Sequence, residues 1–394
     1  MKLSEPFANN VLTDAAEKHS EENRAWQGAP SIARTRGGRL FVSLMSGGIY
    51  EPDPRNCAIA VYSDDNGESW SEPLFVIESM PEKRLRTTDP EFWLAPNGAL
   101  WLIWAEIPYP AGLEMPTYEQ LIDMENDSEY HLLENQVKMY ASVCENPDGE
   151  ELVFSAPRFL FDGYLQNRPF VTPGGRWLFP TWLTSPRPFY QFHYSDDQGQ
   201  TFHTTEPCYA RPDGRHYDEP NFYQAKDGRI AALIRQTSTH QMRMWSEDDG
   251  MTWSKPEPLL ETASQRPCCG TLPSGAVYSV SSIHHRSRNG LRLRISADGS
   301  EFEDRLILDD RERVSYPEVV WDEEENLYIV YDRERNNKIR KSRVTGLSEA
   351  AKEILFARIP AEAWKTGRIT SDTVRARIIT KARINELNNR FTEE

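Results

Sequence analysis

The sequence predicts an all-β protein, a six-bladed β-propeller, and two observations carry that prediction. A turn of the form Ser-x-Asp-x-Gly-x-Ser/Thr-aromatic recurs along the chain, and six pairs of short apolar runs are each joined by a tight polar turn. The turns recur at intervals of about fifty residues, which suits one four-stranded blade in a radial array. All-β closed architectures of this kind accommodate all 394 residues in one body.

The recurring turn is expected to be scaffold. Its Ser hydroxyl and Asp carboxylate can bond the main-chain amides of a tight turn, its Gly takes a positive φ, and its aromatic residue can pack between blades. A degenerate unit around residues 142–155 divides the longest gap between copies. The copies occupy residues 63–70, 195–202 and 246–253, with a shortened form at 296–302.

The six apolar pairs supply the inner hairpins of six units. Each pair reads as two short strands joined by a turn, as at Asp227-Gly228. A segment rich in Pro, Glu and Asp over 108–130 enlarges the second unit and is predicted to be a long loop. The hairpins begin near Ile32, Glu91, Pro169, Asn221, Thr271 and Glu318.

The two ends of the chain differ from the repeats. A strand within residues 1–25 is expected to close the ring onto the last blade. From Leu347 the pattern changes to SEAAKEILFARI and VRARIITKARINELNNR, which we interpret as helical. The predicted organisation is therefore a propeller over residues 1–346 and a helical appendage over 347–394.

Composition excludes several classes of function. The formal net charge of −16 argues against a nucleic-acid partner, because phosphate binding requires basic surface. The five cysteines are odd in number and lack a C-x-x-C pair, so neither a disulfide framework nor a zinc site is indicated, and Cys268 and Cys269 are expected to be buried. No Gly-rich phosphate loop or metal-ligand cluster is present, so we expect no cofactor.

No segment has the length and apolarity of a membrane span or of a signal peptide core. A cytoplasmic protein is expected, although a secreted chain trimmed of its signal would give the same pattern. The sequence specifies no oligomeric state.

The turns and hairpins resemble the Asp-box, or BNR-repeat, propellers of the sialidase (neuraminidase) superfamily over residues 26–340. That superfamily places a Glu before the hairpin of a middle blade, an Arg at the end of its second strand, an Arg in the next blade and a Tyr at the start of the last. By this resemblance the matching residues are Glu219, Arg235, Arg288 and Tyr316.

The chemistry of these residue types agrees with the roles that the resemblance implies. A Tyr phenol is a weak nucleophile at neutral pH, since its ordinary pKa is about 10, and a carboxylate beside it can accept its proton. Sialidases use Tyr where other retaining glycosidases use a carboxylate. Tyr316 is therefore the expected nucleophile and Glu219 its base, while Arg235 and Arg288 are expected to hold a substrate carboxylate.

Further site residues are expected on the same face. The general acid of the superfamily is an Asp after the first hairpin, where this chain offers Glu51, which we prefer, or Asp53. Asp89 matches a substrate-contacting Asp of the superfamily at the start of the second blade. Other substrate contacts are expected from Asn167, Arg168, His216 and Arg266. Alternatives to Arg235 and Arg288 as holders of the carboxylate are Arg266, Arg286, Arg313 and Arg333. Because some sugar-cleaving propellers use a His as acid or base, the candidates for that role include His216, His284 and His285.

One departure from the superfamily pattern lies in the first blade. The chain reads WQGAPSIA there, with Ala29 where the superfamily has an Arg, so one arm of a three-Arg carboxylate clamp is missing.

The resemblance implies an exo-acting glycoside hydrolase that releases a terminal, acidic sugar from a carbohydrate substrate. Two alternatives stay open. One is another sugar-cleaving chemistry on the same fold, an inverting glycosidase or a polysaccharide lyase for a uronide or rhamnoside. The other is a glycan-binding propeller without turnover.

Overall fold

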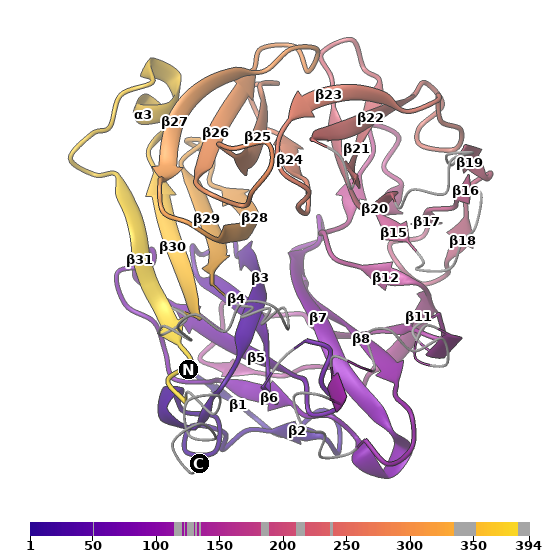
Figure 1. Cartoon of the computed structure of the whole chain (residues 1–394), viewed down its shortest axis with the longest axis vertical. Helices are drawn as coiled ribbons and strands as arrows, with labels where there is room; N and C mark the ends of the chain where they lie inside the picture. The colour runs from indigo at the N-terminus through magenta and orange to yellow at the C-terminus, as the bar shows by residue number, and fades with distance from the viewer. Residues whose placement is uncertain are drawn as a thin grey trace.

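The computed structural model describes residues 1–49, 51–113, 120–121, 123, 130, 132–133, 135–182, 189–209, 217–236, 239–334 and 352–384. Six antiparallel sheets stand radially about a common centre, with the first strand of each sheet innermost (Figure 1). The predicted six-bladed propeller is confirmed. The His216 side chain, an expected substrate contact, lies outside the described residues.

The first three blades follow the chain from inner to outer strand. Blade one holds β3 (Gln27–Arg34), β4 (Leu40–Ser46), β5 (Cys57–Ser63) and β6 (Phe75–Ile77), with β2 (Val11–Leu12) on its outer edge. Blade two holds β7 (Leu85–Leu94), β8 (Leu100–Pro108), β9 (Lys138–Cys144) and β11 (Arg158–Asp162). Blade three holds β13 (Phe170–Val171), β14 (Trp177–Phe179), β17 (His193–Ser195) and β18 (His203–Thr204).

The last three blades repeat this order. Blade four holds β20 (Tyr217–Gln224), β21 (Ile230–Gln236), β22 (His240–Ser246) and β23 (Glu257–Glu261). Blade five holds β24 (Cys268–Thr271), β25 (Val277–Ser282), β26 (Leu291–Ser296) and β27 (Glu303–Asp309). Blade six holds β28 (Val314–Trp321), β29 (Leu327–Arg333), β30 (Glu353–Ile359) and β31 (Val374–Lys381).

Short elements connect the blades. Three two-stranded pairs link β1 (Lys2–Leu3) with β10 (Glu151–Leu152), β12 (Tyr164–Leu165) with β15 (Thr181–Trp182), and β16 (Phe189–Tyr190) with β19 (Cys208–Tyr209). Two 3-10 turns, η1 (Glu21–Asn23) and η2 (Pro81–Lys83), and one α-helix, α3 (Ala361–Thr366), complete the described elements. The predicted loop over 108–130 falls largely outside the described residues.

The prediction of a helical appendage over 347–394 is wrong for the residues that the structure describes. Strands β30 and β31 are the two outer strands of blade six, and only α3 between them is helical. The run VRARIITK alternates basic and apolar residues with a period of two, which suits a strand half covered by its blade. The propeller therefore extends through residue 381, and the boundary at 346 divides its last blade.

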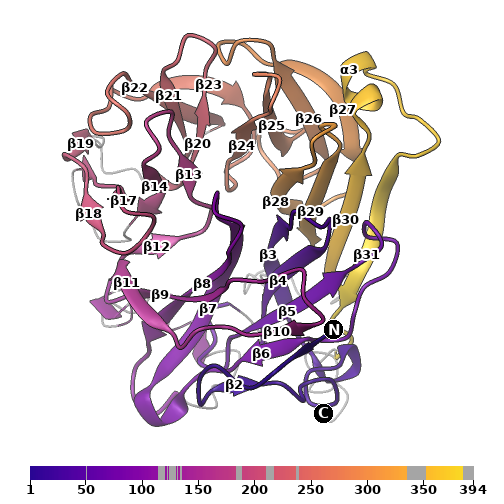
Figure 2. The ribbon, with the colours of Figure 1, turned by 180° about the vertical axis from the view of Figure 1, so that it is seen from behind.

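The strands within residues 1–25 do not pair with the last blade, contrary to the prediction. β2 pairs with β6 of blade one and β1 pairs with β10 near blade two, on the rim that Figure 2 shows beside the N-terminus. Contact with blade six comes instead from a turn, because Glu21 accepts hydrogen bonds from the main-chain amides of Lys381 and Arg383.

The recurring turns have the predicted scaffold role. In the first copy the Ser63 hydroxyl bonds Asp65 and accepts the Gly67 amide at 2.9 Å, while Asp65 also accepts the amide of Ser69. Gly67 has a φ of 82°, and a Cβ there would come within 2.3 Å of Phe356 on the neighbouring blade. The turn thus fixes its own loop and also fits against the next blade.

Apolar side chains fill the spaces between blades. Trp93 of blade two meets Trp177 of blade three edge to face, with ring centroids 4.7 Å apart. Cys268 and Cys269 are buried as predicted, and all five cysteines are free. This packing holds the six inner strands in fixed positions around the centre.

Candidate active site

A shared backbone feature marks the start of the inner strands. Each of the six has a residue followed by Pro, and in blades one, two, four and six that residue has a positive φ of 46–53°. The strand register shifts at the same point in those four blades. Such φ values cost about 1–2 kcal/mol for a residue with a Cβ, and bulges redirect side chains next to sites. The four residues are Ala29, Asp89, Glu219 and Tyr316.

Tyr316 and Glu219 form the central contact of the site. The Tyr316 hydroxyl donates a hydrogen bond of 2.8 Å to Glu219 Oε1, and both residues are buried. Burial alone would raise the pKa of Glu219, but the charges of Arg235 and Arg288 and the hydrogen bond from Tyr316 outweigh it and lower that pKa. Glu219 is therefore a carboxylate at neutral pH and can accept the phenol proton.

Arg235 and Arg288, the two residues expected to hold a substrate carboxylate, lie beside this pair. Arg235 Nη1 donates to Glu219 Oε1 at 2.8 Å, and its Nε donates to the Ser264 hydroxyl at 3.1 Å. Arg288 Nε donates to the Ser264 main-chain oxygen at 3.0 Å, and its guanidinium carbon lies 5.2 Å from the Tyr316 ring centroid. Ser264 thus orients both cations toward the reactive pair.

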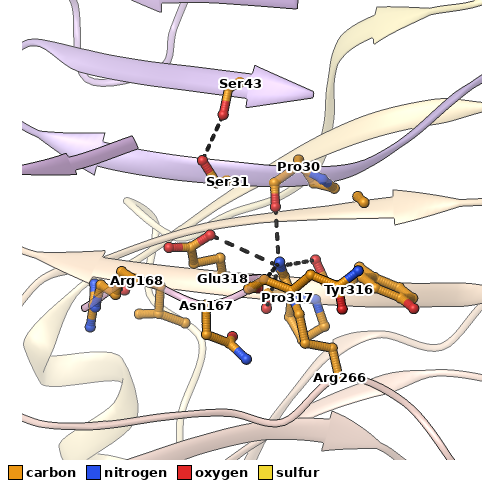
Figure 3. Close-up of polar contacts among 12 residues, drawn as sticks. Pro30, Ser31, Ser43, Asn167, Arg168, Arg266, Tyr316, Pro317 and Glu318 are labelled. Carbon is orange, nitrogen blue, oxygen red and sulfur yellow. Dashed lines mark hydrogen bonds and ion pairs between the residues drawn. The ribbon is translucent and has the colours of Figure 1, made fainter. Parts of the chain in front are cut away.

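Arg266 lies behind Tyr316 as a structural brace. Its Nη2 donates to the main-chain oxygens of Pro30, Tyr316 and Pro317, and its Nη1 donates to that of Gln166 (Figure 3). The residue is 2% exposed. Arg266 was predicted to contact substrate. In the structure these hydrogen bonds go to main-chain oxygens, and they support the backbone around Tyr316.

Asn167 and Arg168, which precede β13 of blade three, point in different directions. The Asn167 amide donates to the main-chain oxygens of Glu219 and Pro220, so it supports the backbone of the base. Arg168 donates to Tyr278 and stacks on Trp321, and in Figure 3 it lies at the end of the view away from Tyr316. There it lines a cavity of about 540 Å³ to which all six inner strands contribute. Arg168 is thus remote from the reactive pair.

The two candidates for the acid differ in their surroundings. Asp53 is completely buried and accepts hydrogen bonds from the main-chain amides of Ile49 and Arg55 and from the Arg55 guanidinium. It fixes the conformation of its own loop. Glu51, two residues earlier, is only partly buried, and of the two it is the one open to solvent.

Asp89 opens blade two at the position that Glu219 and Tyr316 occupy in their blades. Gln166 Nε2 donates to its Oδ1 at 2.9 Å. Burial, and next the negative charge of Glu51, raise the pKa of Asp89 to about 7. The charge of the Glu51 carboxylate therefore acts on the Asp89 carboxyl group.

Sequence reasoning did not identify Asp218 or Ser264. Asp218 Oδ1 lies 3.6 Å from Arg235 Nε, and burial raises the pKa of Asp218 to about 7. The run DEP in the sequence places Asp218 directly before Glu219, and this adjacency was the available signal. Ser264 acts through its hydroxyl and its main-chain oxygen, and its sequence context gives no such signal.

The first blade has an apolar corner where the superfamily has an arginine. Ala29 packs with Trp26, Met45 and the Tyr316 ring, and its amide donates to Asp332 Oδ2 at 2.9 Å. The cations near Tyr316 thus come from blades four and five. His284 and His285 are exposed, and His285 faces Glu261 at 3.6 Å, away from Tyr316.

The described residues contain neither a metal-ligand cluster nor a helix that could cross a membrane. No three His, Cys, Asp or Glu side chains in this part of the chain gather closely enough to hold a metal ion. No helix in the same residues is long and apolar enough to cross a membrane.

The model of the BNR repeat-like domain family matches residues 55–329, well over half of the chain. The chain belongs to the BNR repeat-like family. No curated protein matches it. Similar solved structures include sialidases, intramolecular trans-sialidases and a protein of unknown function from Dyadobacter fermentans, and the identities are low enough that the likeness concerns the fold alone.

Three of these structures illustrate the likeness. The Hadza microbial sialidase Hz136 has a TM-score of 0.63 and 15% identity, over 87% of this chain and 67% of that one. The NanB sialidase from Streptococcus pneumoniae has a TM-score of 0.60 and 14% identity, over 86% and 69%. The intramolecular trans-sialidase from Ruminococcus gnavus has a TM-score of 0.61 and 13% identity, over 91% and 99%. This BNR repeat-like chain is therefore sialidase-like in fold.

Proposed function

We propose that this chain is an exo-acting glycoside hydrolase that releases a terminal, acidic sugar from a glycan. The single observation that carries the proposal is the 2.8 Å hydrogen bond from the Tyr316 hydroxyl to an ionised Glu219. Both groups come from strained positions at the start of inner strands, and backbone strain of this kind gathers at functional sites.

The first chemical step follows from this contact. The Tyr316 oxygen attacks the anomeric carbon and transfers its proton to Glu219 while the glycosidic carbon–oxygen bond breaks. Ionised Glu219 makes the phenol a better nucleophile than its ordinary pKa of about 10 allows. Arg235 and Arg288 limit the build-up of negative charge next to the attacking oxygen.

The leaving oxygen requires a proton from the opposite side of the sugar. Attack in line with the departing group puts the acid across the sugar from Tyr316. Glu51 suits this role because it belongs to a loop, is partly exposed and is near enough for its charge to raise the pKa of Asp89, which opens blade two. Asp53 is unsuited because its carboxylate already accepts four hydrogen bonds from its own loop.

The second step reverses these transfers. Glu51, now ionised, takes a proton from water, the water oxygen attacks the anomeric carbon, and the sugar–tyrosine bond breaks. Glu219 returns its proton to the Tyr316 oxygen. Two inversions retain the anomeric configuration, which separates this route from an inverting one.

Arg288 supports the choice of an acidic sugar. Its Nε is held by Ser264, and its terminal nitrogens have no hydrogen-bonding partner among the described residues. A guanidinium presents two parallel N–H groups that match a carboxylate. A substrate anion would complete this arrangement beside the nucleophile.

A panel of 4-methylumbelliferyl glycosides, including sialosides, glucuronides and rhamnosides, tests the proposal. The wild-type protein is expected to release fluorophore from an acidic member and to give a product of retained configuration by NMR. Tyr316→Phe should abolish release and Glu219→Gln should slow it by about 10²–10⁴-fold, while circular dichroism stays unchanged. Binding without release would favour a glycan-binding propeller, and full turnover by both variants would refute the assignment.

A further inference from the structure

We propose that Asp218 makes the capture of an anionic sugar depend on proton uptake, so that the site binds its substrate with Asp218 in the neutral form. This inference rests on the proposed function, because it takes Arg235 and Arg288 as the groups that hold the sugar's carboxylate. It adds a regulatory residue that precedes the base in the chain.

The geometry gives Arg235 two acidic partners. Glu219 Oε1 accepts from Nη1 at 2.8 Å, and Asp218 Oδ1 lies 3.6 Å from Nε, with both side chains largely shielded from solvent. The positive charge of Arg288 also lowers the pKa of both carboxyl groups. When both arginines and both carboxyl groups are ionised, the two positive charges of Arg235 and Arg288 are balanced by the negative charges of Asp218 and Glu219. A substrate carboxylate would then be a third anion at a neutral site, which like-charge repulsion disfavours.

One of the two carboxylates has to become neutral to relieve this repulsion, and Asp218 is the better candidate. Glu219 accepts hydrogen bonds from Tyr316 and Arg235, which favour its ionised form. Asp218 has only the longer ion pair with Arg235 among the described residues. Its burial raises its pKa to about 7; Arg235 and Arg288 lower that pKa and Glu219 raises it.

The sign of the pH effect follows from this charge balance. An incoming carboxylate raises the pKa of Asp218 further, so binding above pH 7 takes up a proton. Affinity for an anionic sugar should therefore be constant below about pH 6 and should fall above pH 7, approaching a tenfold loss per pH unit above about pH 8. A neutral sugar adds no charge, and its affinity should show no such fall.

Steady-state kinetics with the 4-methylumbelliferyl glycosides tests this dependence. For an acidic glycoside, the wild-type KM is expected to rise about fivefold between pH 7 and pH 8 with little change in kcat. Asp218→Asn should keep a nearly constant KM over that range. Asp227→Asn is the matched control, because it removes the same charge from an exposed turn of the same blade, and it should behave as wild type.

A binding experiment separates this inference from the hydrolase proposal. Calorimetry of free N-acetylneuraminic acid and glucuronic acid at pH 7.5, in two buffers of different ionisation heat, should give an uptake of about 0.8 proton per sugar bound. Uptake that disappears in Asp218→Asn supports the inference even if no glycoside is cleaved. Turnover with a pH-independent KM and no proton uptake would overturn it and leave the hydrolase standing. A protein that neither binds nor cleaves any acidic sugar would refute both.

Discussion

Replacing Glu219 by Gln removes the proposed base while keeping the volume of the side chain. Glu219 Oε1 accepts hydrogen bonds from both Tyr316 and Arg235 at 2.8 Å, and a Gln amide oxygen can accept one or both of them. An amide does not take up a proton at neutral pH. Loss of a positioned general base typically slows reactions by about 10²–10⁴-fold, or about 3–5 kcal/mol in the barrier. We expect kcat to fall by that factor.

The stability of the Glu219→Gln variant should change much less. Breaking a buried ion pair outright costs about 3–5 kcal/mol, but Arg235 keeps Asp218 as a partner at 3.6 Å. We therefore expect a loss of about 1–2 kcal/mol in the free energy of unfolding, measured by denaturant titration. Glu257→Gln is the matched control, since Glu257 pairs with Arg243 on the exposed edge of the same blade. A kcat within tenfold of wild type would refute the role of Glu219.

Three further predictions concern the acid, the brace and the scaffold. Glu51→Gln should slow the cleavage of glycosides with poor leaving groups more than that of glycosides with good ones. Asp53→Asn should slow the cleavage of both kinds alike and should lower the melting temperature. Equal slowing of both kinds by Glu51→Gln would exclude Glu51 as the acid. Arg266→Met should lose about 3 kcal/mol or more of stability, because main-chain oxygens in the buried centre lose their donor; calorimetry showing an unchanged melting temperature would contradict this. Gly67→Ala should cost about 1–3 kcal/mol through its positive φ and its contact with Phe356, with kcat unchanged per folded molecule; a neutral result in denaturant titration would contradict the scaffold role.

The fold was predictable because its signals are local. The recurring turn satisfies its hydrogen bonds within about seven residues, as the contacts from Ser246 to Gly250 and from Asp248 to Thr252 illustrate. Blade count follows directly from such turns and hairpins. The last blade is the exception: we interpreted the alternation of basic and apolar residues in VRARIITK as helical, whereas a period of two is typical of a strand such as β31.

The site was predictable only in part. Tyr316 and Glu219 lie 97 residues apart in the sequence, and they meet because both open inner strands of the ring. The directions of Arg266 and Arg168 were not predictable, since each depends on which oxygens of other blades lie within hydrogen-bonding distance. The raised pKa of Asp218 likewise arises from burial by separate blades.

Trapping of the glycosyl-enzyme intermediate tests the central claim most directly. A glycosyl fluoride of the accepted sugar, with a second fluorine next to the anomeric carbon, slows both chemical steps, while the fluoride leaving group favours the first. Peptide mapping by mass spectrometry should then find the sugar on the peptide containing Tyr316, bound to the tyrosine oxygen. Turnover with the sugar attached to a carboxylate, or with no covalent species under these conditions, would contradict the account.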